Sequence, residues 1–409
     1  MKIRTRSIAT AVAGLATAAM IAVSTPANAA VTTNQLLIWV DSGNKPVIQK
    51  VVYAWAAAND VEVTLVGKDF GQTRDLVKTA VPAGTGPDVL AAAPHDWTGN
   101  LAAAGVLRTI TLPASVKAGL QANALAGFKV SGKQYGVPAW TENIAWLRNV
   151  KKAPKAVTLL SQVKNGELEI GYGTDDGDPY HFYPLQTAFG APVFTSTSAG
   201  WTSTLGMNNT AGRAFAAWLE SKGAAFFGTP SNWGNLACDF ILGKKKYWIT
   251  GPWSITDIQN GKAGCTVGLK IGTGYAIDKF PKGTTTGRQF MGVRGFFITN
   301  SATTDVKAAT KLLTYLAGSV PQTVFFTKDK KTPANLKALA VAKKDKVIAG
   351  FATAGATAVP MPNIPAMDSV WSKWGKAQAR LIKKAKTEAT AGAEWTKMNN
   401  EIKALIAGN

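Results

Sequence analysis

Aromatic side chains stand beside carboxylates at several separated places in the sequence. A sugar ring has apolar C–H faces, which aromatic rings cover, and a rim of hydroxyls, which form charge-assisted hydrogen bonds to carboxylates. Because the clusters are spread along the chain, we expect them to form one carbohydrate-binding cleft between two domains. The clusters are His95-Asp96-Trp97, Trp140-Thr141-Glu142, the run from Asp178 to Tyr183, Gly251-Pro252-Trp253, and the pair Trp371 and Trp374.

Signatures of enzyme catalysis are scarce in the same sequence. His95 and His181 are its only histidines, and it has no Gly-x-Ser-x-Gly elbow. The run Gly84-Thr85-Gly86-Pro87-Asp88 lacks the Lys-Ser/Thr ending of a phosphate loop, so it predicts a turn into a strand. Glu142 and Asp178 could still form the carboxylate pair of a glycoside hydrolase. We therefore expect a binding protein without catalytic residues, with a glycoside-processing enzyme as the alternative.

The sequence contains two cysteines, Cys238 and Cys265. With the two histidines they supply too few ligands, too far apart, to predict a metal site, and we expect no cofactor. An oxidising compartment favours a disulfide between them, and closing a loop of this size would contribute about 3 kcal/mol in the chain-entropy description. No cysteine precedes Cys238, so we expect no lipid anchor.

The first thirty residues have the features of a secretory signal peptide. Three basic residues among the first six precede an apolar run from Ile8 to Val23, and small residues suit cleavage near Ala29. We therefore assign residues 1–29 to the signal. The apolar run is shorter than the roughly 20 residues of a membrane-spanning helix, so we expect an exported mature chain without membrane insertion, in a periplasm or at the cell surface.

The sequence is strongly basic. Its net charge is +21, of which three charges belong to the signal, leaving +18 on the mature chain. The lysines are scattered and no nucleic-acid-binding motif accompanies them, so we expect no nucleic-acid partner. A structural or adhesive envelope protein that binds an anionic polymer is a third hypothesis, and its binding would depend strongly on salt.

About 380 residues remain after the signal, more than one hydrophobic core usually holds, so we expect two domains. Residues 36–40 predict a strand, Pro46 opens a helix, and residues 61–66 predict a second strand. This order is typical of α/β domains with largely parallel sheets flanked by helices. We also expect a helix at 74–81, strands at 87–92, 135–139, 247–250, 267–271 and 295–299, helices at 305–317 and 371–386, and a surface connection at 352–358.

The most informative motifs are Leu37-Ile38-Trp39-Val40-Asp41, Gly86-Pro87-Asp88-Val89, Ala104-Gly105-Val106-Leu107, Gly132-Lys133-Gln134-Tyr135-Gly136-Val137-Pro138, Gly251-Pro252-Trp253 and Met361-Pro362-Asn363-Ile364-Pro365-Ala366-Met367. In order and spacing they resemble the maltose and maltodextrin binding proteins, the periplasmic components of ABC sugar importers. The resemblance extends, with gaps, from about Leu36 to about Lys384.

This resemblance implies a two-lobed clamp like that of the periplasmic binding proteins, in which α/β lobes joined by crossover hinge segments close on a ligand. We expect one lobe from residues 30–140 and 286–330 and the other from residues 141–285 and 331–409. The implied function is to capture a sugar, expected to be maltose or a maltooligosaccharide, and to deliver it as a monomer to the permease subunits of an ABC importer. A different oligosaccharide or small solute is the alternative ligand.

The resemblance also implies ligand-binding roles for individual residues. They are hydrogen-bond acceptors (Asp96, Glu142, Asp178), stacking rings (Tyr180, Trp253, Trp371), polar ligands in a loop (Asp41, Lys45) and a methionine that lines the cleft (Met361).

Five positions depart from the pattern of the family, among them Asp178, which is one methylene shorter than the family's Glu. Ala93 stands in place of an aromatic residue, Trp97 and Gly375 in place of arginines, and Ser372 in place of a tyrosine. We expect the stacking surface of the first lobe to have moved from position 93 to Trp97. The sugar-binding class is therefore better supported than maltose itself.

Overall fold

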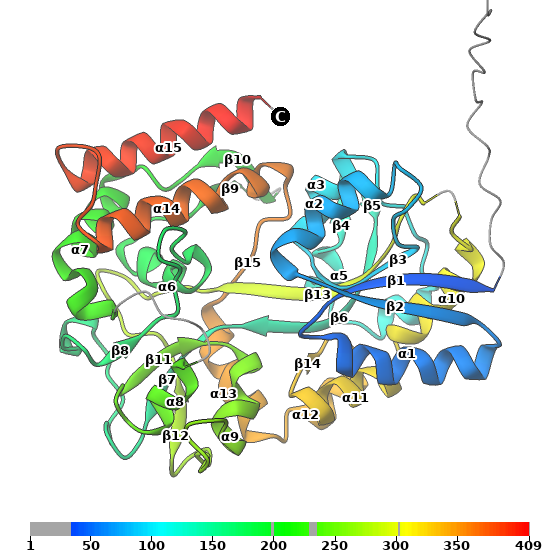
Figure 1. Cartoon of the computed structure of the whole chain (residues 1–409), viewed down its shortest axis with the longest axis horizontal. Coiled ribbons are helices and arrows are strands. Elements are labelled where there is room, and N and C mark those ends of the chain that lie inside the picture. The colour runs from blue at the N-terminus through cyan, green and yellow to red at the C-terminus, as the bar shows by residue number, and fades with distance from the viewer. Residues whose placement is uncertain (1–33, 198–199, 229–234, 302, 409) are drawn as a thin grey trace, which may run out of the picture.

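The computed structural model describes residues 34–197, 200–228, 235–301 and 303–408. The predicted signal peptide lies outside these residues. The described chain forms two α/β lobes, and strands β6 and β13 run from one lobe toward the other (Figure 1).

The first lobe is built on a sheet with the strand order β14-β6-β13-β3-β1-β2, and β15 pairs with β13. Its strands are β1 (Gln35–Asp41), β2 (Glu62–Lys68), β3 (Val89–Pro94), β6 (Gly136–Asn143), β13 (Phe290–Ile298), β14 (Thr332–Pro333) and β15 (Val359–Pro360), with a small hairpin of β4 (Lys129–Val130) and β5 (Lys133–Gln134). Its helices are α1 (Lys45–Asn59), α2 (Phe70–Ala80), α3 (Trp97–Ala103), α4 (Ala114–Ala118), α5 (Ala122–Ala126), α10 (Val306–Leu316), α11 (Ser319–Asp329) and α12 (Leu336–Ala342).

The second lobe is built on a sheet with the strand order β12-β7-β11-β8. Its strands are β7 (Ala145–Asn149), β8 (Leu168–Glu169), β11 (Tyr247–Thr250) and β12 (Tyr275–Asp278), with a hairpin of β9 (Phe194–Thr197) and β10 (Gly200–Leu205). Its helices are α6 (Pro179–Phe189), α7 (Thr210–Phe227), α8 (Leu236–Ile241), α9 (Ile255–Asn260), α13 (Lys346–Ala354), α14 (Trp371–Ile382) and α15 (Ala391–Ala407). Short 3-10 turns are η1 (Leu160–Gln162), η2 (Pro252–Ser254), η3 (Gly355–Thr357) and η4 (Pro365–Ser369).

Local sequence signals account for where several helices begin. Pro46 occupies the first turn of α1, where a missing backbone N–H costs nothing. The side chain of Asp69 caps α2 by accepting from the backbone N–H of Gln72 at 3.2 Å. Asp178 caps α6 in the same way and thereby fixes the place of the residues that follow it.

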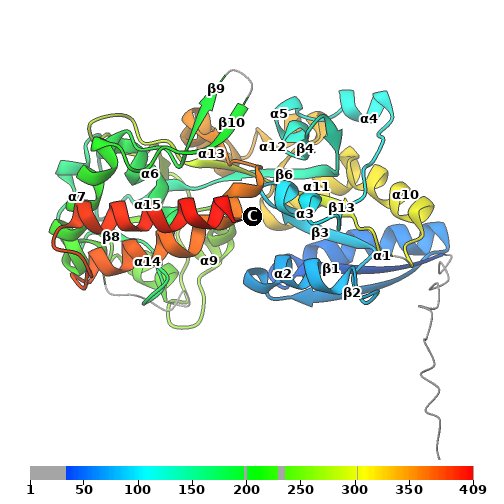
Figure 2. The same cartoon turned by 90° about the horizontal axis from the view of Figure 1, so that it is seen from above.

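Each lobe has its own hydrophobic core. The first core is formed by side chains of the first sheet and its helices, from Leu36 to Ala334. The second core surrounds Trp146, Trp374 and Trp395, all completely buried. Helices α14 and α15 lie side by side along the second lobe and pack on α7 (Figure 2). The chain passes between the lobes more than once, as expected of lobes that are wound together.

Three details differ from the sequence expectations. The sheets are mixed: β1 is parallel to β2 and β3, but β13 is antiparallel to β3 and β6, and β7 is antiparallel to β11 and β12. The strand expected at 267–271 does not form: Val267 is 79% exposed, and Ile271 makes only an isolated bridge to Tyr275. Finally, β14 pairs with β6 and α12 packs on α11, so residues 332–342 lie with the first lobe, whereas the predicted division assigned them to the second.

A disulfide joins Cys238 to Cys265, as the sequence predicted. It links α8 to the loop after α9, on the second lobe. Within the described residues, no helix combines the length and the apolar character needed to cross a membrane.

Candidate functional site

A cavity of about 520 Å³ lies between the two lobes. The first lobe and β13 contribute Phe70, Gly71, Arg74, Pro94, Asp96, Trp97, Glu142, Gly292, Val293 and Arg294 to its lining. The second lobe and the segment that leads to it contribute Asp178, Tyr180, His181, Trp253, Met361 and Trp371. The cavity therefore combines carboxylates, a guanidinium and aromatic rings from distant parts of the chain.

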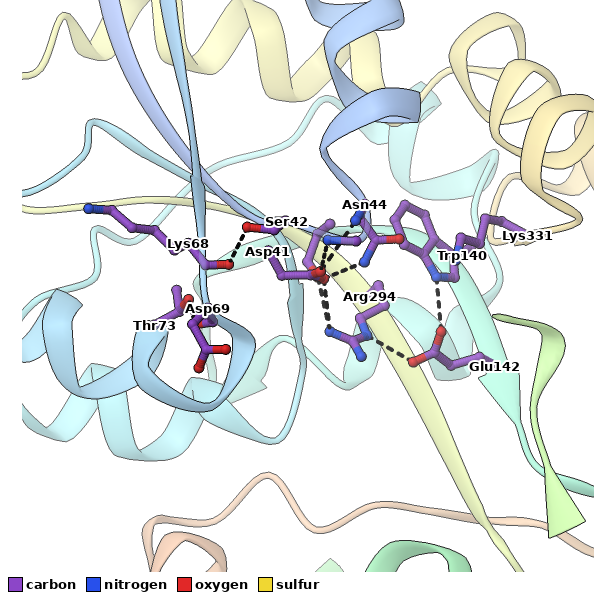
Figure 3. Close-up of polar contacts among 12 residues, drawn as sticks. Asp41, Ser42, Asn44, Lys68, Asp69, Thr73, Trp140, Glu142, Arg294 and Lys331 are labelled. Atoms are coloured by element: carbon purple, nitrogen blue, oxygen red, sulfur yellow. Dashed lines mark hydrogen bonds and ion pairs between the residues drawn. The ribbon is translucent and has the colours of Figure 1, made fainter. Parts of the chain in front are cut away.

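The floor of this cavity on the first lobe is an ion pair between Glu142 and Arg294 (Figure 3). Arg294 Nε donates to Glu142 Oε1 at 2.8 Å, and Trp140 Nε1 donates to Glu142 Oε2 at 3.2 Å. Asp41 Oδ2 lies 3.9 Å from the same guanidinium, and Lys331 Nζ lies 5.3 Å from the centre of the Trp140 ring. These contacts hold the Glu142 carboxylate in one orientation.

The electrostatics of the floor favour a charged Glu142. Burial by itself disfavours the charge, but the attraction of Arg294 and Lys331 and the two side-chain hydrogen bonds outweigh it and lower the pKa of Glu142. Glu142 is therefore an acceptor of hydrogen bonds at neutral pH.

Asp96 is the second carboxylate that the first lobe contributes to the cavity, and it directly precedes α3. Only 7% of its surface is exposed, and its Oδ1 atom has no hydrogen-bond partner among the described residues. Burial raises the pKa of Asp96 to about 7, although Arg74 and Arg294 pull it down. A buried acceptor without a partner beside a cavity is suited to receive a hydrogen bond from a ligand.

His95, which precedes Asp96, has a structural role. Its Nδ1 atom accepts from the backbone N–H of Val293 at 3.1 Å, and its Nε2 atom lies 3.0 Å from the carbonyl oxygen of Met361. Burial lowers the pKa of His95 to about 4, so the ring is neutral at pH 7. The neutral ring ties the end of β3 to β13 and to the segment that carries Met361.

The opposite wall of the cavity, on the second lobe, is aromatic. The Tyr180 ring lies 6.3 Å from the Trp253 ring and 6.1 Å from the Phe290 ring. Trp371 stacks on the buried Trp374 at 5.9 Å between ring centres. Trp253 keeps 37% of its surface exposed. These rings offer apolar faces to whatever occupies the cavity.

Asp178 lies at the edge of this wall, with both carboxylate oxygens in use. Oδ1 accepts from the backbone N–H of His181 at 3.0 Å, and Oδ2 lies 2.7 Å from His181 Nδ1. Asp178 therefore caps α6 and orients the imidazole of His181, which also lines the cavity.

The structure brings together eight of the ten residues to which ligand-binding roles were predicted. Asp41 instead lines an adjoining cavity of about 300 Å³ with Asn44 and Lys331, and this cavity shares Glu142 and Arg294 with the main one. The remaining residue, Lys45, opens α1 and lies outside the lining of both cavities, with its side chain beside Gly67.

Among the charged and aromatic cavity residues, the sequence expectations missed Phe70, Arg74 and Arg294, and His181 was named only as part of the 178–183 cluster, without a role. Arg294 had a usable signal, because it is a single charge within the apolar strand from Phe290 to Ile298. Phe70 had a weaker one as a ring directly after the helix-capping Asp69.

Gly375, one of the departures from the family pattern, has a packing reason. A Cβ atom at this position would collide with the backbone carbonyl of Asp176, so only glycine lets the 173–177 loop lie on α14. Ala93 is buried in the first core, and Trp97 lines the cavity.

No group of three or more metal-ligating side chains occurs among the residues described.

Comparison with known proteins places the chain in a family. Residues 50–352 match the family described as bacterial extracellular solute-binding protein, and the chain belongs to it. It is therefore a solute-binding protein, and its cavity lies between the two lobes.

Curated relatives extend the comparison over most of the chain. The maltooligosaccharide ABC transporter solute-binding lipoprotein of Streptococcus pneumoniae is 27% identical over 358 residues, which cover 82% of this chain and 81% of the relative. The maltodextrin-binding protein MdxE of Bacillus subtilis is 27% identical over 359 residues, 82% of each chain. The galactooligosaccharide-binding protein of Bacillus subtilis is 24% identical over 360 residues, 83% of this chain and 82% of the relative.

Solved structures agree on the fold. The maltotriose binding protein of Thermus thermophilus, bound with maltotriose, matches 91% of this chain and 100% of its own with a TM-score of 0.78 and 24% identity. This confirms the predicted two-lobed α/β architecture.

Proposed function

We propose that this protein captures a maltooligosaccharide in the cavity between its lobes and delivers it to the permease of an ABC importer. The observation that carries the proposal is the composition of the cavity, which combines carboxylates with aromatic rings contributed by both lobes. Sugars need both, because their hydroxyls form charge-assisted hydrogen bonds and their C–H faces pack on rings. Two relatives of this chain are named for maltooligosaccharides or maltodextrin.

The proposed roles follow the geometry. Glu142 and Asp96 accept hydrogen bonds from sugar hydroxyls, because one is held charged and the other has an unused acceptor atom. Tyr180, Trp253 and Trp371 stack on the sugar rings.

Four further residues have supporting roles in this proposal. Met361 and Trp97 complete the lining of the cavity between the lobes. Asp178 acts through His181, since both of its oxygens are engaged with that residue. Asp41 extends the polar surface into the adjoining cavity.

The two lobes are proposed to close on the sugar by a hinge at the segments that pass between them. These are the junction of β6 and β7, the residues leading into β13, the turn between α12 and α13, the turn from α13 to β15, and the segment from β15 to α14. The first lobe in this proposal extends to α12. The closed protein, a monomer, would then meet the permease.

We further propose that the protein is exported, carries no lipid anchor and is not an enzyme. Both cysteines of the sequence are joined to each other, which leaves neither to carry a lipid. A glycoside hydrolase needs one protonated carboxyl group as its acid. The lowered pKa of Glu142 and the engaged oxygens of Asp178 argue against that use of this pair.

Titration calorimetry of maltotriose into the protein and its variants tests the proposal. Trp253→Ala and Trp371→Ala should each weaken binding by more than about 1 kcal/mol, the order expected for aromatic packing. Tyr53→Ala is the matched control, because Tyr53 is 41% exposed on α1 outside both cavities. Unchanged affinity in both tryptophan variants would contradict the proposal that the sugar binds in this cavity.

A ligand screen and a product assay separate the remaining alternatives. Melting temperature in the presence of maltose, maltotriose, longer dextrins and galactooligosaccharides identifies the ligand, since a ligand of the native state raises apparent stability. Incubation with maltodextrins should yield no shortened products. Shortened products would favour the glycoside-processing enzyme.

A further inference from the structure

One end of the second-lobe sheet carries an excess of lysines. Strand β7 ends there, and its antiparallel neighbours β11 and β12 begin there, as does β8, which is parallel to β11. The segments that meet at this end therefore come from four parts of the chain. Their lysines, which we call the basic end, are Lys151, Lys152, Lys155, Lys164, Lys244, Lys245, Lys246 and Lys270.

Backbone and side-chain contacts hold these segments together. The backbone N–H of Asn149 donates to the carbonyl of Lys246 at 2.8 Å, and that of Val150 donates to Gly274 at 3.0 Å. The backbone N–H of Gly274 in turn donates to the carbonyl of Lys270 at 2.7 Å. The stem of Lys152 lies against Gly243. The lysines thus project from one ordered surface.

Carboxylates balance only part of this charge. Glu167 pairs with Lys246 at 2.6 Å, Asp239 pairs with Lys244 at 2.9 Å, and the buried Glu169 lies 3.9 Å from Lys245. The other five lysines are exposed, and the described residues include no ion pair for them: Lys151, Lys152, Lys155, Lys164 and Lys270.

The basic end faces away from the cavity between the lobes. Glu142 lies just before the start of β7, and Trp253 lies just after the end of β11, so the opposite end of the same sheet adjoins the cavity. A partner at the basic end would leave the cavity free.

We propose that the basic end binds a linear anionic polymer with a phosphodiester backbone at the cell surface. Neighbouring strands lie about 4.8 Å apart, so the ends of the four strands, from which the loops with these lysines extend, form a row about 15 Å long. A row of flexible cations matches a chain of evenly spaced phosphates, each of which releases condensed counterions when a lysine neutralises it. This proposal is independent of the identity of the sugar.

Binding of poly(glycerol phosphate) at 50 to 200 mM salt tests the proposal. The variant Lys151→Gln/Lys155→Gln/Lys270→Gln removes three unpaired lysines of the basic end. Each lysine–phosphate contact contributes about 0.7 to the slope of log affinity against log salt, so the slope should fall by about 2. Over this fourfold range of salt, the affinity of the unaltered protein should then drop about 15-fold more than that of the variant.

The matched control is Lys117→Gln/Lys129→Gln/Lys133→Gln, which removes three exposed lysines of the first lobe. The control should keep the salt slope of the unaltered protein, and all three proteins should keep their melting temperature. Equal losses in the two triple variants would overturn the proposal, because the charge would then act without a defined site. Absence of binding by the unaltered protein at 50 mM salt, or tighter binding to phosphatidylglycerol vesicles at equal phosphate concentration, would also overturn it.

Discussion

Glu142 and Arg294 on the first lobe leave only 10% and 16% of their side chains exposed, whereas Trp253 on the facing wall leaves 37% of its surface exposed. The first lobe presents charges that are already paired with each other, with the ring of Phe70, which is 44% exposed, beside them. The second lobe presents rings that stand partly in solvent.

The difference separates two kinds of contribution to binding. The paired charges of the floor have a fixed geometry, and that geometry depends on partners from distant strands. The rings of the wall contribute contact area and pack on other rings rather than on paired charges. Removing part of the floor should therefore cost fold stability as well as binding, while removing a ring such as Trp253 should cost binding alone.

The largest effect is expected for Arg294→Met. It leaves the Glu142 carboxylate buried without its main partner, and breaking a buried ion pair in this way costs about 3 kcal/mol or more of unfolding free energy. Urea denaturation measures that loss, and calorimetry should detect almost no binding of maltotriose.

The double variant Arg294→Met/Glu142→Gln provides the control. It removes the unpaired charge, so most of the stability should return, while sugar binding should stay weak because the acceptor is neutral. A single variant as stable as the unaltered protein would mean that the floor is held by other contacts.

The second expected effect concerns the stability of the second lobe. Replacing both Cys238 and Cys265 by serine removes a cross-link between residues that are 27 positions apart. The chain-entropy description gives a loss of about 3 kcal/mol. Denaturant unfolding with one probe in each lobe should show a loss confined to the second lobe or shared by both. A loss confined to the first lobe would contradict the location of the bond.

A smaller effect is expected for Phe70→Ala, the most exposed ring that the first lobe contributes to the cavity. Phe70 stacks on Trp97 at 5.4 Å, and the Arg294 guanidinium lies 4.7 Å from its ring centre. Its loss should weaken maltotriose binding about fivefold, or about 1 kcal/mol, with little change in stability. If Phe70→Ala lost more affinity than Trp253→Ala, the contrast between the two lobes would be wrong, since the first lobe would then also bind the sugar mainly by stacking.

The sequence was most informative where signals are local. The alternation of apolar residues and the helix-start proline predicted β1, α1 and β2, and the aromatic–acid clusters predicted most of the wall. The strand that does not form at 267–271 shows the limit of composition, because Val267 has the residue type of a strand but is 79% exposed and pairs with no strand among the described residues.

Contacts between residues that are far apart in the chain could not be predicted from the sequence. Arg294 pairs with Glu142, which is 152 positions away, and the residues next to Arg294 in the sequence do not indicate this partner. The lysines of the basic end look scattered because they span residues 151 to 270, and only the order of strands in the sheet gathers them. Mixed strand directions likewise depend on how the lobes are connected.

The final prediction compares one carboxyl group in each lobe by its response to pH. Burial raises the pKa of Asp96 and of Glu169 to about 7, although nearby cations oppose it. In the unfolded chain both titrate near 4. The folded state thus holds extra protons between about pH 4 and 7, and the stability contributed by the protonated groups is present below pH 4 and lost as the pH rises through 7. Asp96→Asn and Glu169→Gln should each flatten this loss in denaturation experiments.

Binding should distinguish the two groups, because only Asp96 lines the cavity. A carboxylate accepts stronger hydrogen bonds than a neutral acid, so sugar binding should favour ionised Asp96. Below pH 7 the ligand must displace a proton, and calorimetry should show affinity rising from pH 6 to pH 8. Asp96→Asn should remove this rise and Glu169→Gln should keep it. If Glu169→Gln also removed it, the pH response would belong to the fold as a whole, and the floor of the cleft would have no proton-linked role of its own.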